Sequence, residues 1–158
     1  MESNFICSVL ATDIKNQVVL DLLQRNVSRN ALLADGKVSV MPLDFNDDLA
    51  QGSGLEKVDM VLAGDVIYDD TITDSFVKFL LHLRHLTSGP LNVLVTLERR
   101  VVFTVADLEE RCPAYEHLMI RLGEEKERVV VKEIEINWSQ HLCYERSNEL
   151  VLLHILVH

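Results

Sequence analysis

The sequence predicts an α/β protein built on a mostly parallel sheet, and two observations carry this prediction. Short apolar runs typical of buried strands alternate with segments whose apolar residues recur at helical spacing. Two apolar runs, at 128–138 and 149–157, then follow each other without a helix between them, which predicts a C-terminal antiparallel strand pair. No linker-like stretch interrupts the chain, so residues 1–158 are expected to form a single domain.

The stretch at 58–70 is expected to hold the central strand of this sheet and the loop that follows it. An apolar run bounded by turn-prone residues is typical of a strand buried on both faces. Ligands of open α/β sheets bind outside the carboxyl ends of such strands, so Asp65 and Tyr68 are candidate site residues. The structural alternative is a loop in which Asp69 or Asp70 caps the next helix, and the two interpretations are compatible.

The N-terminal third predicts a strand, a helix and a strand. The apolar run at 5–12 predicts a buried parallel strand, and the apolar stripe in 15–30 predicts an amphipathic helix. Alternation in 37–43 predicts a half-buried strand, and Pro42 favours an edge position because it has no N–H to donate to a neighbour. The polar segment 46–57 is expected to be a loop with a short helical turn.

The remaining elements continue the alternation. Apolar residues on one face predict a helix at 71–86, and an apolar run predicts a strand at 91–97. A third helix is expected at 104–122, broken or kinked at Pro113 because proline cannot donate within a helix.

Acidic residues follow three further strands of this prediction. Asp13 stands where an acid would accept hydrogen bonds from a ribose diol or cap the next helix, and the local pattern by itself favours the cap. Asp44 and Phe45 would hold a purine by hydrogen bonding and stacking, or would form an ordinary turn. Glu98, followed by two arginines, falls at the same sheet edge, with a solvated turn as the alternative.

No metal site is expected. His82 and His85 lie three residues apart on a predicted helix, but no acid or cysteine stands nearby to complete a ligand set. A solvated helix face is the interpretation that we favour for both histidines.

Composition restricts the partners. The chain carries 15 Lys and Arg against 25 Asp and Glu, a net charge of -10. This charge disfavours direct nucleic-acid binding, which depends on phosphate contacts, and suits a basic protein partner. The apolar runs are too short to cross a bilayer, and residues 1–4 lack the basic region of a secretory signal. Three widely spaced cysteines without a Cys-x-x-Cys motif predict buried, reduced thiols in an intracellular protein.

Seven short motifs along nearly the whole chain share a likeness to one family: ATD at 11–13, QRN at 24–26, LDF at 43–45, DVIYDD at 65–70, ERR at 98–100 with FT at 103–104, AYEH at 114–117 and YER at 144–146. With these motifs and the terminal antiparallel pair, the chain resembles the class I S-adenosylmethionine-dependent methyltransferases, which have a Rossmann-like sheet. More narrowly, it resembles the family 16 protein-lysine methyltransferases. The Asp-x-x-Tyr motif of Asp65 and Tyr68 is fairly specific to the lysine-modifying group.

The resemblance implies S-adenosylmethionine as the cofactor. Asp13 would bind its ribose, and Asp44 with Phe45 would contact the adenine end. Asp65 would line the pocket where cofactor and acceptor meet.

The resemblance also implies a lysine side chain of a protein, expected to be basic, as the methyl acceptor. Asp65 and Tyr68 would act at the methyl-transfer site and hold this lysine, and Glu98 is a further substrate-side candidate. The family implies a location in the nucleus, the cytoplasm or both.

The chain departs from the family at its start. The family begins with a central strand and an acid-x-Gly-x-Gly loop that approaches the cofactor, and none of the six glycines stands in that context. The resemblance therefore implies an N-terminally truncated domain whose first central strand is missing, with weakened cofactor binding and stability. An inactive fragment that acts only in protein interaction is the alternative to an active enzyme. A different nucleotide-binding α/β domain is a third hypothesis, against which the terminal strand pair and the Asp-x-x-Tyr motif count.

Overall fold

The computed structural model describes residues 8–31, 37–49, 52–104 and 109–158. The chain divides into two compact units, Met1–Asp47 and Asp48–His158, which are described separately below and called the N-terminal and C-terminal units. The expectation of a single domain stays a prediction. In the described ranges no helix combines the length and the apolar character needed to cross a membrane.

The N-terminal unit contains a strand, a helix and a strand in the predicted order: β1 (Val9–Asp13), α1 (Gln17–Arg29) and β2 (Val38–Pro42). The predicted burial of the first strand is wrong, because no residue of β1 is buried. The strands pair in parallel, with Asp13 opposite Pro42, and α1 packs against both. Among the described residues β1 is the one strand that pairs with β2, in agreement with the edge position expected from Pro42. Residues 5–7 of the predicted first strand lie outside the described residues.

The N-cap residue of α1 is not Asp13, the residue that the local sequence pattern favoured. Asn16 is the N-cap residue, and its Oδ1 accepts hydrogen bonds from Val18 N (3.0 Å) and Val19 N (3.4 Å). The carboxylate of Asp13 instead accepts a hydrogen bond from the adjacent Ile14 N (2.8 Å). The prediction that Asp13 caps this helix is therefore wrong, because the helix starts three residues later than that role requires.

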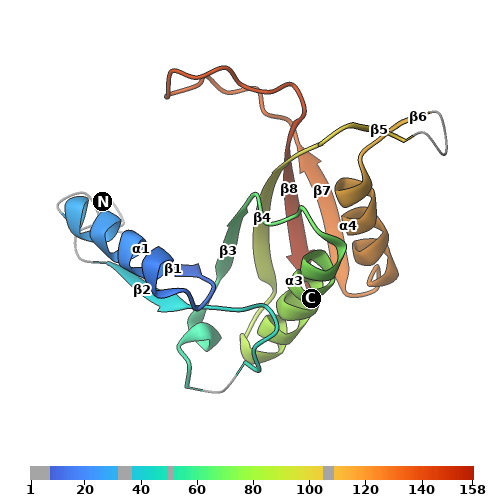
Figure 1. Ribbon diagram of the computed structural model, residues 1–158. Coiled ribbons are helices and arrows are strands. Elements are labelled where there is room, and N and C mark those ends of the chain that lie inside the picture. The colour runs from blue at the N-terminus through green and yellow to red at the C-terminus, as the bar shows by residue number, and fades with distance from the viewer. Residues whose placement is uncertain (1–7, 32–36, 50–51, 105–108) are drawn as a thin grey trace, which may run out of the picture. The chain divides into compact units, whose positions relative to one another are not determined.

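The C-terminal unit is built on a four-stranded mixed sheet in the order β3-β4-β8-β7 (Figure 1), with β3 (Met60–Gly64), β4 (Leu91–Glu98), β8 (Leu150–Val157) and β7 (Val129–Ile134). The first two strands are parallel, whereas β8 is antiparallel to both of its neighbours. The α/β class and the C-terminal antiparallel pair are confirmed. The last strand of the chain lies inside the sheet, between β4 and β7.

Two helices, α3 (Asp70–Leu86) and α4 (Pro113–Glu124), cover one face of this sheet (Figure 1). Every second residue of β4 and β8 points to this face, and these side chains form the core with Phe76, Leu80 and Leu118. The expectation that β3 is buried on both faces is wrong in the described residues, because on the other face Met60 is 53% and Leu62 is 72% exposed. In the described sheet β3 is an end strand that pairs with β4. The buried members of β4 and β8 are Leu91, Val93, Val95, Leu97, Val151, Leu153, Ile155 and Val157.

The predicted helix at 104–122 is wrong in its first half. Two short strands, β5 (Val102–Thr104) and β6 (Glu109–Arg111), pair antiparallel, with Phe103 opposite Glu110. Residues 105–108 between them lie outside the described residues. Pro113 begins α4 instead of kinking a longer helix, because the first helical position needs no N–H donor and suits the fixed φ of proline.

Smaller differences concern lengths and thiols. The strand expected at 128–138 ends at Ile134, whereas the short helical turn expected in 46–57 is present as η1 (Leu55–Lys57). The prediction of buried thiols is wrong for Cys143, which is exposed, while Cys112 is half-buried. Cys7 lies outside the described residues.

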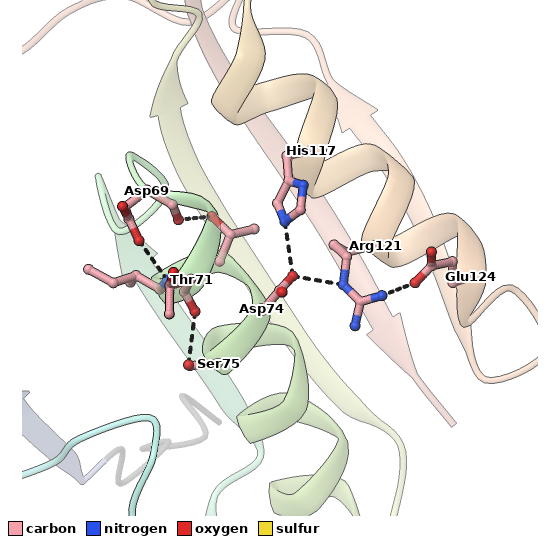
Figure 2. A network of polar contacts seen from close by, with 9 residues as sticks. Asp69, Thr71, Asp74, Ser75, His117, Arg121 and Glu124 are labelled. Atoms are coloured by element: carbon pink, nitrogen blue, oxygen red, sulfur yellow. Dashed lines mark hydrogen bonds and ion pairs between the residues drawn. The ribbon is translucent and has the colours of Figure 1, made fainter.

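A polar network joins α3 to α4 (Figure 2). The Oδ1 atom of Asp74 hydrogen-bonds His117 Nε2 at 2.9 Å and forms an ion pair with Arg121 Nε at 2.8 Å. Arg121 also pairs with Glu124 in the next turn. The hydrogen bond to His117, assisted by the charge of Arg121, holds the pKa of Asp74 below its usual value. The network thus favours an ionised Asp74 in the folded protein.

We expect Phe76→Ala to lower the free energy of unfolding by about 3–5 kcal/mol, because it leaves a cavity in the core. Phe76 is 1% exposed, whereas Phe103 is 63% exposed. Phe103→Ala is therefore the matched control and should change the free energy by less than about 0.5 kcal/mol. Urea unfolding followed by circular dichroism measures both, and equal effects would contradict the assigned core.

We expect Asp74→Asn to destabilise the protein at about pH 5, and the difference from wild type to shrink by about pH 2.5. A depressed folded-state pKa gives stability that is present above the unfolded value of 3.8 and is lost as the pH falls through the folded value. Melting temperatures provide the measurement, with the exposed Asp59→Asn as control. A deficit of equal size at both pH values would contradict this role for Asp74.

Candidate active site

The N-terminal unit places its predicted site residues at the carboxyl end of its two strands. Asp13 is the last residue of β1 and is exposed, and its backbone oxygen accepts a hydrogen bond from Leu43 N (2.8 Å). Asp44 and Phe45 follow directly after Leu43, and both are half-buried. The three predicted cofactor residues of this unit therefore lie at one edge of the β1–β2 sheet, as parallel pairing requires.

Asp44 takes part in the turn chemistry that was the alternative for it. Its Oδ1 accepts hydrogen bonds from Asn46 N (2.9 Å) and Asn46 Nδ2 (3.0 Å), and its backbone oxygen accepts one from Asp47 N (3.0 Å). These hydrogen bonds from Asn46 lower the pKa of Asp44. The carboxylate is thus held ionised and in a defined orientation at the end of β2.

In the C-terminal unit, Asp65 follows the last residue of β3 and has an unusual backbone. Its φ of 54° lies in the left-handed region, the one positive φ at a non-glycine residue in the described chain. Asp65 N donates to Thr96 O at 2.8 Å, so the ladder with β4 holds this conformation. Aspartate tolerates the left-handed region better than most residues, but an outlier at a strand end is typical of a functional position.

The side chain of Asp65 points to a partner that sequence reasoning did not name. Arg100 Nη2 lies 3.1 Å from Oδ1 and 3.0 Å from Oδ2 of Asp65. Both side chains are more than half exposed, at 53% for the arginine and 62% for the aspartate. The two arginines after the strand at 91–97 were the available signal, although nothing local to them identifies Asp65 as the partner.

Tyr68 lies in the loop between β3 and α3 and is 53% exposed. The neighbouring Ile67 is 2% exposed and anchors this loop in the core. Asp69 is the N-cap of α3, since its Oδ1 accepts from Ile72 N at 3.1 Å, which confirms the predicted capping role. The loop is therefore fixed on both sides of Tyr68, and the ring of Tyr68 remains accessible.

Glu98 is the last residue of β4 and is exposed, so it lies at the carboxyl edge that the sequence predicts. Its neighbour Arg99 points to other elements: Nη2 lies 3.0 Å from Glu133 Oε2, and the guanidinium lies 4.7 Å from the ring centre of Tyr115. The hydrogen bond with Tyr115, together with the charge of Glu133, raises the pKa of Arg99. Arg99 thus ties β4 to α4 and β7, and leaves Glu98 and Arg100 beside the candidate site.

The two histidines that the sequence analysis considered as metal ligands do not lie in this site. His82 and His85 are both exposed on α3, as expected for a solvated helix face. Among the described residues no group of histidine, cysteine and acidic side chains is arranged to hold a metal ion.

The fold of the chain is similar to part of the fold of solved methyltransferases. A solved structure of mitomycin 7-O-methyltransferase aligns with a TM-score of 0.52 and 17% identity, covering 93% of this chain and 41% of that one. An O-methyltransferase family protein from Burkholderia thailandensis aligns with a TM-score of 0.51 and 15% identity, covering 95% and 43%. The Rossmann-like class I methyltransferase fold is confirmed by these likenesses, which carry no information on substrate.

The family is shown by sequence. A family model described as lysine methyltransferase matches residues 2–104, and the chain belongs to this family. Methyltransferase-like protein 22 of Homo sapiens is 30% identical over 94% of this chain, and that of Mus musculus is 29% identical over 99%. The chain spans 42% and 44% of the lengths of these two relatives.

We expect Asp65→Ala to be less stable than Asp65→Gly by about 1 kcal/mol. Both variants lose the ion pair with Arg100, but alanine has a Cβ that clashes at the φ of 54°, whereas glycine has none. Urea unfolding of the two variants measures the difference. If alanine were as stable as glycine, the left-handed conformation at this position would be contradicted.

Proposed function

We propose that the chain is the catalytic part of an S-adenosylmethionine-dependent methyltransferase that modifies a lysine side chain of a protein. Membership of the lysine methyltransferase family supports the reaction class. One structural observation carries the proposal: a carboxylate stands at or just after the end of each parallel strand, at Asp13, Asp44, Asp65 and Glu98. The carboxyl ends of parallel strands are where α/β folds bind ligands and place chemistry.

The cofactor is assigned to the residues of the N-terminal unit. The exposed carboxylate of Asp13 accepts a hydrogen bond from Ile14 N and has further lone pairs for the two hydroxyl groups of a ribose. Asp44, oriented by Asn46, and the half-buried ring of Phe45 suit the adenine end. Two hydrogen-bond acceptors and an aromatic ring therefore fit the ribose and adenine of S-adenosylmethionine, which would supply a methyl group on a sulfonium when bound.

The acceptor lysine is assigned to Asp65 and Tyr68. Methyl transfer needs a neutral amine held in line with the methyl group, so positioning supplies most of the rate. The Asp65 carboxylate attracts and orients the lysine in its ammonium form, which loses one proton to solvent before methyl transfer. The exposed Tyr68 ring gives this nitrogen an aromatic wall. Glu98 adds a second carboxylate on the substrate side.

A protein substrate is supported by the loop at 135–149, which leaves the sheet beside the end of β4 (Figure 1). Trp138, Leu142 and Tyr144 on this loop are 50%, 74% and 56% exposed, and such side chains often anchor protein contacts. The exposed acids of the loop, at 135, 145 and 149, favour a basic partner by charge complementarity. We propose a location in the nucleus, the cytoplasm or both, which is what the family resemblance implies.

We expect Asp13→Ala to weaken binding of S-adenosylhomocysteine at least tenfold, equivalent to about 1.4 kcal/mol, because the carboxylate accepts from the ribose. Calorimetric titration of the whole chain measures this, and Asp21→Ala, an exposed acid on α1, is the matched control. Wild-type binding that survives Asp13→Ala unchanged would contradict the role of this residue.

Methyl transfer from labelled S-adenosylmethionine to lysine-rich protein then tests the reaction itself. If the folded wild-type chain released no binding heat at high concentration, the alternative of a non-catalytic interaction fragment would replace the proposed activity.

A further inference from the structure

The contact between Arg100 and Asp65 places a cation where the proposed reaction needs a lysine. The guanidinium atom Nη2 lies within 3.1 Å of both carboxylate oxygens of Asp65. Arg100 follows β4 and Asp65 follows β3, so two separate strands bring the pair together. Its neighbour Arg99 contacts Glu133 and Tyr115 instead, which leaves Arg100 as the arginine committed to Asp65 at this edge.

This ion pair is weak enough to exchange. Both side chains are more than half exposed, and exposed ion pairs of this kind change an equilibrium constant only roughly two- to five-fold. Another cation that binds Asp65 therefore loses only this small factor in affinity by having to displace the guanidinium.

The carboxylate would stay in place after such an exchange. The position of Asp65 depends on its backbone, which is held at a φ of 54° by the hydrogen bond from its N–H to Thr96 O (2.8 Å). Arg100 follows the end of β4 and has an exposed side chain. The hydrogen bond that holds the backbone of Asp65 does not constrain it. The arginine is thus the mobile partner and the aspartate the fixed one.

We propose that Arg100 is an internal competitor for a cation site at Asp65, from which the ammonium group of a substrate lysine displaces it. The inference rests on the proposed function, which assigns the lysine to this carboxylate. Arg100 is then a specificity-determining residue: a small amine gains little by replacing it, whereas a lysine within a protein also gains contacts elsewhere on the surface.

Titration with n-butylammonium, which has the shape and charge of a lysine side chain, tests the competition without cofactor. The shifts of the backbone amide signals of residues 65 and 100 in nuclear magnetic resonance spectra give the dissociation constant. We expect Arg100→Gln to tighten binding roughly two- to five-fold, because the internal cation is gone. Arg100→Lys keeps a competing cation and should restore an affinity close to wild type.

Two further variants serve as controls. Asp65→Asn removes the charge but tolerates the left-handed backbone, so the chain should stay folded and lose the saturable shifts. Arg128→Gln removes an arginine of similar exposure that pairs with Glu125 at the opposite edge of the sheet, and its affinity should equal that of wild type.

Three results would overturn the proposal: equal affinity of wild type and Arg100→Gln, an equal gain in Arg128→Gln, or no saturable shift at residue 65 in any variant. Since the titration needs neither cofactor nor catalysis, its failure is distinct from a failure to bind S-adenosylhomocysteine or to transfer methyl groups.

Discussion

The position of β8 between β4 and β7 is the constraint on which the rest of the C-terminal unit depends. Its pairing with β4 sets Leu150 opposite Glu98, and Arg99 N extends the ladder by donating to Glu149 O at 2.9 Å. The chain after β4 and the loop before β8 therefore leave the sheet at the same edge. Parallel pairing of β3 with β4 brings Asp65 to that edge as well. The registers of these two strand pairs thus bring the candidate substrate residues to one edge.

The polar contacts of the C-terminal unit differ in purpose. Asp74, His117 and Arg121 join two helices that cover the core, and they are partly shielded from solvent (Figure 2). The pair of Asp65 and Arg100 joins two strand ends and lies in solvent, where it adds little stability. A weak contact on a strained backbone is poor at holding a fold together but well suited to exchange with a ligand.

Local patterns predicted the elements wherever one periodicity prevailed. The stripe in α3 and the apolar runs of β4 and β8 are strong signals, because their residues are buried against one packed core. The segment before Pro113 misled, since its charged and apolar residues fit a helix and a hairpin about equally well. In the structure Phe103 pairs with Glu110, so the segment forms two antiparallel strands. The spacing of apolar residues along the chain does not reveal such a contact between strands. The N-cap at Asn16 was also not predicted, because it depends on the residue at which the helix starts, and the apolar spacing does not fix that residue.

The sequence by itself determined the α/β class, the acids at the strand ends and the family, because periodicity and short motifs are local properties of the chain. The tertiary structure alone decided that β8 lies inside the sheet and that Arg100, rather than Arg99, reaches Asp65. It also decided the left-handed backbone of Asp65, which follows from its bond to Thr96 on another strand. These features depend on register between distant segments, and register is fixed by burial of a whole sheet face rather than by any one residue.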